Sequence, residues 1–224
     1  MAGYSCKSKD SISATLTFIK GEVKVTNGEV ETTAKVGDKV LQGNTVSTGE
    51  KSVAILAIDD NSSRIELQSN AKIVVETSTA ESKKIFLQKG SAWTSVEKLP
   101  KNSKYSLHTP TSVAGVRGTK FYTFSFNGIY GTCFCEGKVE YNAKTSVYHQ
   151  ENSEDYVIFT KGDVSALVTQ KELAEAGISD PGHHHSVIDN SPLGKKYSLT
   201  KEEEQIFFGL AQKKLAEAAN STEK

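Results

Sequence analysis

Short, β-branched runs separated by glycine-containing turns dominate residues 15–168. Apolar and polar positions alternate through many of these runs, and the segments 23–25 and 72–75 are clear examples. An alternation of period two is typical of half-buried β-strands. The Asn27-Gly28 pair predicts a hairpin because both residues tolerate positive φ. Since no helical periodicity lies between the runs, the pattern predicts an all-β body without crossover helices.

The pattern changes after this body. Thr169-Gln-Lys-Glu172 is a capping box, which predicts a short helix near 169–176. Thr200-Lys-Glu-Glu203 repeats the signal and predicts an amphipathic helix near 201–220 with one apolar stripe. Such stripes usually dock on the body of the protein, and we expect the same here. The alternative is a helix offered to a partner.

Charge and composition narrow the classes of partner. The 224 residues hold 27 basic and 27 acidic side chains, so the formal net charge is zero. A nucleic-acid binder needs an excess of cations for phosphates, so we expect no nucleic-acid partner. Arg64 and Arg117 are the only arginines, which excludes an arginine-lined phosphate surface. No apolar run approaches the roughly 18–20 residues that span a bilayer.

Cys6 is a candidate for lipidation. It follows the small residues Ala2, Gly3 and Ser5 and precedes a polar tract. This arrangement is similar to the end of a lipobox, where bacterial lipoproteins are cleaved and acylated on cysteine, and the first Met would then replace a removed signal. The alternative is a free cysteine in a flexible tail. On the lipoprotein interpretation, residues 1–14 form a flexible linker behind a lipid anchor.

One segment, Leu107 to Phe121, points to a family. A strand ends at Thr-Pro, an Arg-Gly-Thr follows, and a new strand starts with an aromatic residue. This resembles the signature of FecR domains, and other family features occur in order over about residues 15–165. They include Gly21-Glu-Val-Lys-Val, Val36-Gly-Asp38, Arg64-Ile-Glu-Leu67 and Glu136-Gly-Lys-Val139. Together with Cys6, the chain is most similar to FecR-domain lipoproteins of spirochaete envelopes.

The resemblance implies a mainly β, FecR-type domain, either a rolled sandwich or a short β-solenoid of many short strands. It also implies a non-enzymatic protein of the bacterial cell envelope, in the outer membrane or periplasm, that binds a partner or ligand. Family members that pass an iron-uptake signal to a sigma factor have a cytoplasmic segment and a transmembrane helix. We expect neither here, and we do not carry that function over.

Arg117 lies between Gly115 and Gly118, where the backbone can turn tightly. Its five donors can tie several carbonyls together, so we expect a buried, structural arginine rather than a ligand-binding one. We extend this structural role to the whole motif. Its residues are Thr109, Pro110, Gly115, Arg117, Gly118, Thr119 and Phe121.

Cysteine and histidine residues offer a second hypothesis. Cys133 and Cys135 share one face of a predicted strand at about 7 Å, too far apart for an unstrained disulfide. A Cys-x-Cys pair with imidazoles suits zinc or copper. The imidazoles available are those of His149, His183, His184 and His185. The alternative is that the cysteines pack in the core and the histidine run lies in a solvated loop.

No sequence motif for catalysis is present. We find no glycine-rich phosphate loop, no Gly-x-Ser-x-Gly and no His-Glu-x-x-His. The chain therefore divides into the linker 1–14, a FecR-like β domain at 15–168 and a C-terminal extension at 169–224 with the histidine loop and helix. We expect a binding, signalling or scaffold module of the envelope. The alternative is a metal-binding or metal-sensing envelope protein, and an unrecognised hydrolase comes third.

Overall fold

The computed structural model describes residues 14–58, 62–144, 146–151, 156–178 and 200–222, and within them sixteen strands join one sheet. The first eight strands are β1 (Ala14–Lys20), β2 (Val23–Asn27), β3 (Val30–Thr33), β4 (Lys39–Val40), β5 (Thr45–Thr48), β6 (Val53–Ile58), β7 (Ser63–Leu67) and β8 (Lys72–Ser78). The other eight are β9 (Ser82–Lys89), β10 (Ser91–Val96), β11 (Lys104–His108), β12 (Ser112–Phe126), β13 (Ile129–Ala143), β14 (Val147–Glu151), β15 (Tyr156–Lys161) and β16 (Val164–Thr169).

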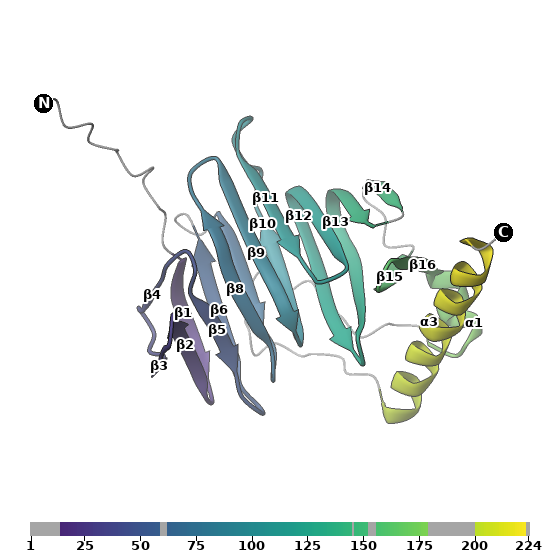
Figure 1. The fold of residues 1–224 in the computed structure, drawn as a ribbon, viewed down its shortest axis with the longest axis horizontal. Helices are drawn as coiled ribbons and strands as arrows, with labels where there is room; N and C mark the ends of the chain where they lie inside the picture. Colours follow the sequence, from purple (N-terminus) through teal and green to yellow (C-terminus); the bar gives the residue numbers. More distant parts are fainter. Residues whose placement is uncertain (1–13, 59–61, 145, 152–155, 179–199, 223–224) are drawn as a thin grey trace, which may run out of the picture.

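The sheet curls into a half-barrel (Figure 1). Its path runs β3-β2-β5-β8-β9-β11-β12-β10-β7-β6-β1-β4, so the consecutive strands β1 and β2 lie near opposite ends of it. All neighbours are antiparallel except β9 and β11, which are parallel. A solenoid would stack parallel coils. The mainly β prediction is confirmed, and the rolled alternative describes the fold.

The main core fills the inside of the curl. Leu16, Leu56, Ile73 and Ile85, which come from β1, β6, β8 and β9, are fully buried in one hydrophobic cluster. Residues at alternate positions of the strands face outward, as the period-two pattern requires. The predicted hairpin also forms between β2 and β3, but its turn lies one residue later than expected. Asn27 pairs with Val30 as the last residue of β2, so the two-residue loop is Gly28-Glu29, and Gly28 supplies the positive φ.

Strands β12 and β13 form the longest pair in the sheet, with 15 residues each. The sequence pattern predicts shorter strands that start or stop near Gly118 and Gly137, and this expectation is wrong. Both glycines adopt positive φ, +68° and +97°, and the register shifts between Arg117 and Lys120. The bulge absorbs the irregularity, so both strands continue through it.

The C-terminal part extends the sheet from β13. β15 pairs with β13 and β16 with β15, and helix α3 (Lys201–Thr222) packs against both (Figure 1). The short helix α1 (Gln170–Glu175) follows β16, and its capping box on Thr169 is formed as predicted. Both predicted helices are thus confirmed. Within the described residues, neither helix is apolar over a long enough stretch to cross a bilayer.

A second hydrophobic cluster attaches α3 to the sheet. Phe207 is 4% exposed, and its ring lies 5.4 Å from that of Phe159 and 5.8 Å from that of Phe124. Ile206, which the helical periodicity places on the apolar stripe, is instead 41% exposed.

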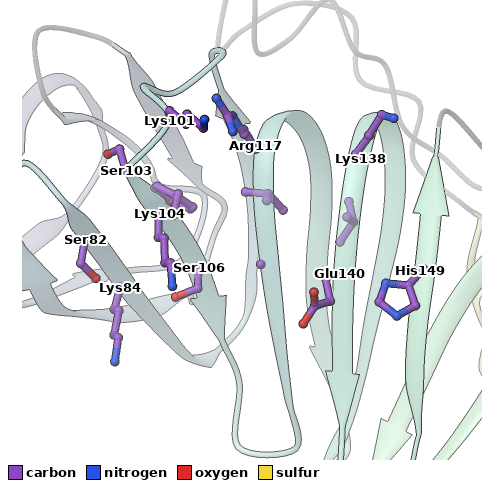
Figure 2. A pocket seen from close by; sticks show the side chains of 14 residues that line it. Ser82, Lys84, Lys101, Ser103, Lys104, Ser106, Arg117, Lys138, Glu140 and His149 are labelled. Carbon is purple, nitrogen blue, oxygen red and sulfur yellow. The ribbon is translucent and has the colours of Figure 1, made fainter.

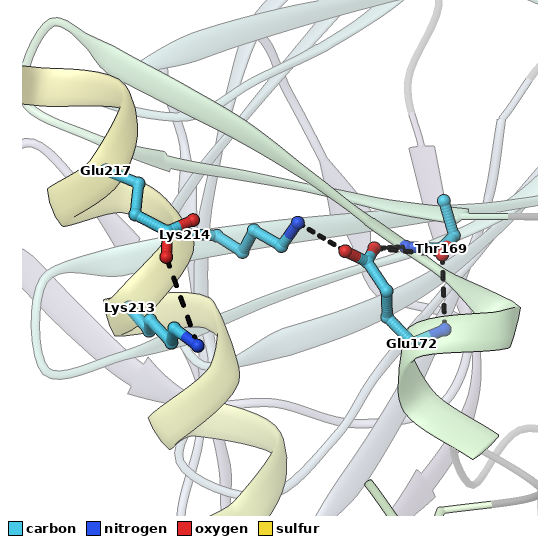
Figure 3. A network of polar contacts seen from close by, with 5 residues as sticks. All are labelled: Thr169, Glu172, Lys213, Lys214 and Glu217. Carbon is cyan, nitrogen blue, oxygen red and sulfur yellow. Dashed lines mark hydrogen bonds and ion pairs between the residues drawn. The ribbon is translucent and has the colours of Figure 1, made fainter. Parts of the chain in front are cut away.

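A polar contact also holds α3. Lys214 of α3 forms an ion pair with Glu172, which also accepts a hydrogen bond from the Thr169 backbone (Figure 3). The apolar face of α3 is therefore docked, as we expected.

Candidate functional site

A groove of about 750 Å³ lies over β9, β11, β12, β13 and β14 (Figure 2). Alternation along the strands explains its lining, because Tyr105 and Val116 point into the core while their neighbours Lys104 and Arg117 point out. Its charged and imidazole side chains are those of Lys84, Lys101, Lys104, Arg117, Lys138, Glu140 and His149. Because five of these carry a fixed positive charge, we call it the cationic groove.

The strand register arranges the lining in two rows. The first row runs across five strands, from Lys84 through Ser106, Gly115 and Glu140 to His149. Each of these residues faces the next one on the neighbouring strand. The row has positive charge at its β9 end and a carboxylate and an imidazole at its β14 end.

The second row lies two residues further along each strand. Ser82 faces Lys104, and Arg117 faces Lys138. Continuing the β11–β12 register by one residue places Lys104 opposite Arg117. Neighbouring strands are about 4.8 Å apart, so three cationic residues start within roughly 10 Å of one another. Beyond Lys138, Glu151 occupies the facing position on β14.

The Arg-Gly-Thr motif builds the bulge that sets this second row. The hydroxyl of Thr119 donates a hydrogen bond to the carbonyl of Lys138 at 2.9 Å. A Cβ on Gly137 would lie 2.2 Å from the carbonyl oxygen of Gly118, so a side chain does not fit there. The close approach of the two glycines holds Arg117 opposite Lys138.

Arg117 itself is exposed, which corrects the expectation of a buried arginine. Its Nη2 donates a hydrogen bond to the carbonyl of Leu99 at 3.1 Å, and this is one carbonyl rather than several. Leu99 lies in the turn before β11, two residues from Lys101. The contact therefore ties the turn that carries Lys101 to the groove and leaves the guanidinium charge at the surface.

The other motif residues have local roles. The hydroxyl of Thr109 accepts a hydrogen bond from the Ser112 N–H at 3.0 Å and so closes the turn between β11 and β12 around Pro110. Phe121 is fully buried in the main core. Thr109 thus stabilises a turn, and Phe121 packs in the core.

The groove cations have few acidic neighbours. Among the described residues, no carboxylate forms an ion pair with Lys84, Lys101, Lys104 or Arg117. The carboxylate inside the groove, Glu140, accepts a hydrogen bond from Asn142 at 3.1 Å. Like charges on facing strand positions repel. The described part of the groove therefore has a surplus of positive charge.

Ser106 and His108 are the nearest approach to a nucleophile and a base. The Ser106 hydroxyl lies 2.9 Å from Nε2 of His108, whose Nδ1 is 3.8 Å from Oε2 of Glu76. Burial lowers the pKa of His108; the charge of Glu76 acts against this shift, and the charge of Lys84 adds to it. Ser106 and His108 lie in a regular ladder, which engages the neighbouring backbone N–H groups. The arrangement lacks the free amide donors of an oxyanion hole.

Of the predicted metal ligands, the structure describes Cys133, Cys135 and His149, and it does not bring the histidine to the two cysteines. Cys133 and Cys135 form no disulfide and are buried in the cluster beneath α3, while His149 is exposed in the cationic groove. The described residues contain no group of three or more His, Cys, Asp or Glu that could hold a metal. Cys6 and His183, His184 and His185 lie outside the described residues. In the described structure, both cysteines pack in the second hydrophobic cluster.

Sequence reasoning missed the lysines of the groove. Lys104-Tyr-Ser-Leu-His108 alternates polar and apolar residues, which indicates one outward face. These lysines come together because β9 pairs in parallel with β11, and the sequence pattern of a single strand does not predict which strand it pairs with. Because the formal net charge of the chain is zero, its composition gives no sign of the local surplus of positive charge in the groove.

Comparison with known proteins supports part of the resemblance. Residues 44–140 match the family model described as FecR protein. Two crystal structures of a putative anti-sigma factor from Parabacteroides distasonis are similar at 15% identity, with TM-scores of 0.49 and 0.48. The alignments cover 59% of this chain and 63% and 62% of the other, so the chain spans less than two thirds of that protein's length.

No curated protein matches the chain. The narrower likeness to spirochaete lipoproteins therefore stays a prediction. The matched segment begins just before β5 and ends within β13, and it contains Lys84, Lys101, Lys104, Arg117 and Lys138. The segment that matches the FecR model thus carries the cations of the groove.

Proposed function

We propose that this chain is a non-enzymatic binding or signalling module of a bacterial cell envelope, and that the cationic groove is where its partner docks. The single observation behind the proposal is the surplus of positive charge in a groove on the FecR-type segment. FecR-type domains generally act by binding, and the described ladder around Ser106 and His108 lacks the free amide donors that acyl transfer needs.

The proposal includes a lipid anchor at Cys6. A cysteine after small residues at the start of a polar tract is the reason for it. The anchor would hold the β domain at a membrane surface, where the groove meets other envelope proteins. Cys6 lies outside the described residues, so the anchor depends on the sequence pattern alone.

A labelling experiment tests the anchor. The native bacterium is grown with a palmitate analogue, the envelope is fractionated, and the wild-type chain is compared with Cys6→Ser. We expect label and membrane association in the wild type and neither in the variant. Label that survives Cys6→Ser, or a wild-type chain without label, contradicts the anchor.

A cross-linking experiment tests the partner site. Wild type is compared with Lys84→Glu/Lys104→Glu, and the matched control is Lys20→Glu/Lys35→Glu, which changes the net charge equally at exposed sites outside the groove. We expect one envelope partner that the control retains and the groove variant loses. A set of cross-linked proteins that is identical in all three contradicts the groove as the docking site.

A further inference from the structure

We propose that the cationic groove binds an acidic segment of a partner protein, laid in extended form across the sheet from β9 toward β13. The inference rests on the function proposed above and specifies the chemical class of the partner. The carboxylates of the segment would pair with Lys84, Lys104 and Arg117, helped by Lys101 from the neighbouring turn.

Charge complementarity is the first argument. Four cationic side chains lie in the groove without a carboxylate ion pair among the described residues: Lys84, Lys101, Lys104 and Arg117. Their mutual repulsion is relieved when an anion neutralises them. The proposal does not depend on Lys138, which has a further interaction of its own and faces Glu151 in the register.

The distribution of the cations favours a chain of carboxylates over a single phosphate group. Phosphate sites usually gather several free backbone N–H groups at a helix N-terminus or in a nest. Here the floor is a continuous ladder, in which Ser106 pairs with Gly115 and Gly115 with Glu140. The charges are spread over β9, β11 and β12. Several anionic groups, spaced along one molecule, match this spread.

The floor and the dimensions fit an extended peptide. Gly115 has no side chain, so a ligand can approach the sheet closely between Ser106 and Glu140. The hydroxyls of Ser82 and Ser106 lie among the cations and can donate to carboxylates or peptide carbonyls. Four strand spacings from β9 to β14 make about 19 Å, the length of roughly six extended residues.

Glu140 and His149 give the groove a direction. They occupy the β14 end of the first row, and Glu140 would repel an acidic residue there. The acidic part of the ligand therefore belongs over β9, β11 and β12. A neutral or basic residue belongs near Glu140.

The groove does not suit a single-stranded nucleic acid. Such ligands stack their bases on exposed aromatic side chains. The phenol ring of the lining, Tyr105, is only 1% exposed. The cations of the groove would meet phosphates, but among the lining residues the imidazole of His149 is the one exposed ring, which is too little for a row of bases.

Binding of a labelled octaglutamate peptide to the purified chain tests the inference. We expect wild type and the Lys20→Glu/Lys35→Glu control to bind equally, with an affinity that falls as salt is added. Lys84→Glu/Lys104→Glu should weaken binding at least about tenfold, because the new carboxylates of the groove then repel the carboxylates of the peptide. Glu140→Gln should strengthen it about two- to threefold. Circular dichroism and thermal melting show that each variant is folded.

Three results overturn the inference. They are equal affinity of groove variant and control, no binding of octaglutamate at low salt, and binding of polyphosphate or anionic phospholipid vesicles without binding of octaglutamate. The assay uses purified protein, so it is independent of Cys6 labelling. A failed anchor with intact peptide binding leaves the inference standing, whereas a groove-dependent partner without peptide binding removes the inference and keeps the proposed function.

Discussion

Arg117 on β12 lies directly opposite Lys138 on β13. Two cationic residues at facing positions repel each other, and such pairs are unfavourable in a sheet. The bulge at Gly118 and Gly137 nevertheless fixes this register. The Arg-Gly-Thr motif thus serves the geometry of the groove, and the anionic segment that we propose as ligand would neutralise the facing charges.

Gly137→Ala should be strongly destabilising. Its φ of +97° disfavours a side chain, and the new Cβ would meet the Gly118 carbonyl oxygen. We expect a loss of about 3 kcal/mol or more in the free energy of unfolding, measured by urea denaturation. Gly128→Ala is the matched control, because Gly128 also has positive φ but no atom within 4 Å of a Cβ. It should lose about 1 kcal/mol, and equal losses would contradict the role of the bulge.

Arg117→Ala should leave the domain folded. The side chain is exposed and contributes one hydrogen bond, to the Leu99 carbonyl. Losing one such bond costs about 1 kcal/mol in the free energy of unfolding. Urea denaturation measures the change. A variant that no longer unfolds cooperatively would show that Arg117 is a central structural residue after all.

Glu172 should make the attachment of α3 sensitive to acid. The ion pair with Lys214, together with hydrogen bonds from Thr169, lowers the pKa of Glu172 to about 2 from an ordinary value of 4.5. A lowered pKa in the folded state stabilises the protein above pH 4.5, and this contribution is lost as the pH falls toward 2. The wild type should therefore lose more stability over this range than Glu172→Gln, which keeps the capping geometry.

Acid titrations at fixed urea, followed by Trp93 fluorescence in the cluster under α3, give the comparison. Parallel stability curves for wild type and Glu172→Gln between pH 4.5 and 2 would show that the ion pair contributes nothing.

Cys133 and Cys135 should be silent to a thiol reagent in the folded protein. Both are buried beneath α3, so the reagent cannot reach them. In a Cys6→Ser background, we expect no reaction in buffer and two thiols in denaturant. Thiols that react in the folded protein only after a chelator is added would restore the metal hypothesis, with His183 to His185 as the next residues to change.

The sequence predicts local structure well and the site poorly, for a physical reason. Alternation and capping are short-range signals, so the box at Thr169 appears in the structure as expected, and the hairpin between β2 and β3 appears with its turn shifted by one residue. The groove combines β9 with β11, which pair in parallel, and its rows depend on a bulge at Gly118. A local sequence pattern predicts neither the order of the strands in the sheet nor their register. Arg117 was expected to be buried because its glycine neighbours indicate a tight turn but not which way the side chain points.

An amide chemical-shift map of the full chain titrated with octaglutamate tests the cationic groove most directly. We expect shifts concentrated at Lys84, Lys104, Ser106 and Arg117, with none of comparable size on α3. Shifts that lie on α3 or are spread evenly over the surface, or a spectrum that does not change, would contradict the cationic groove as the binding site.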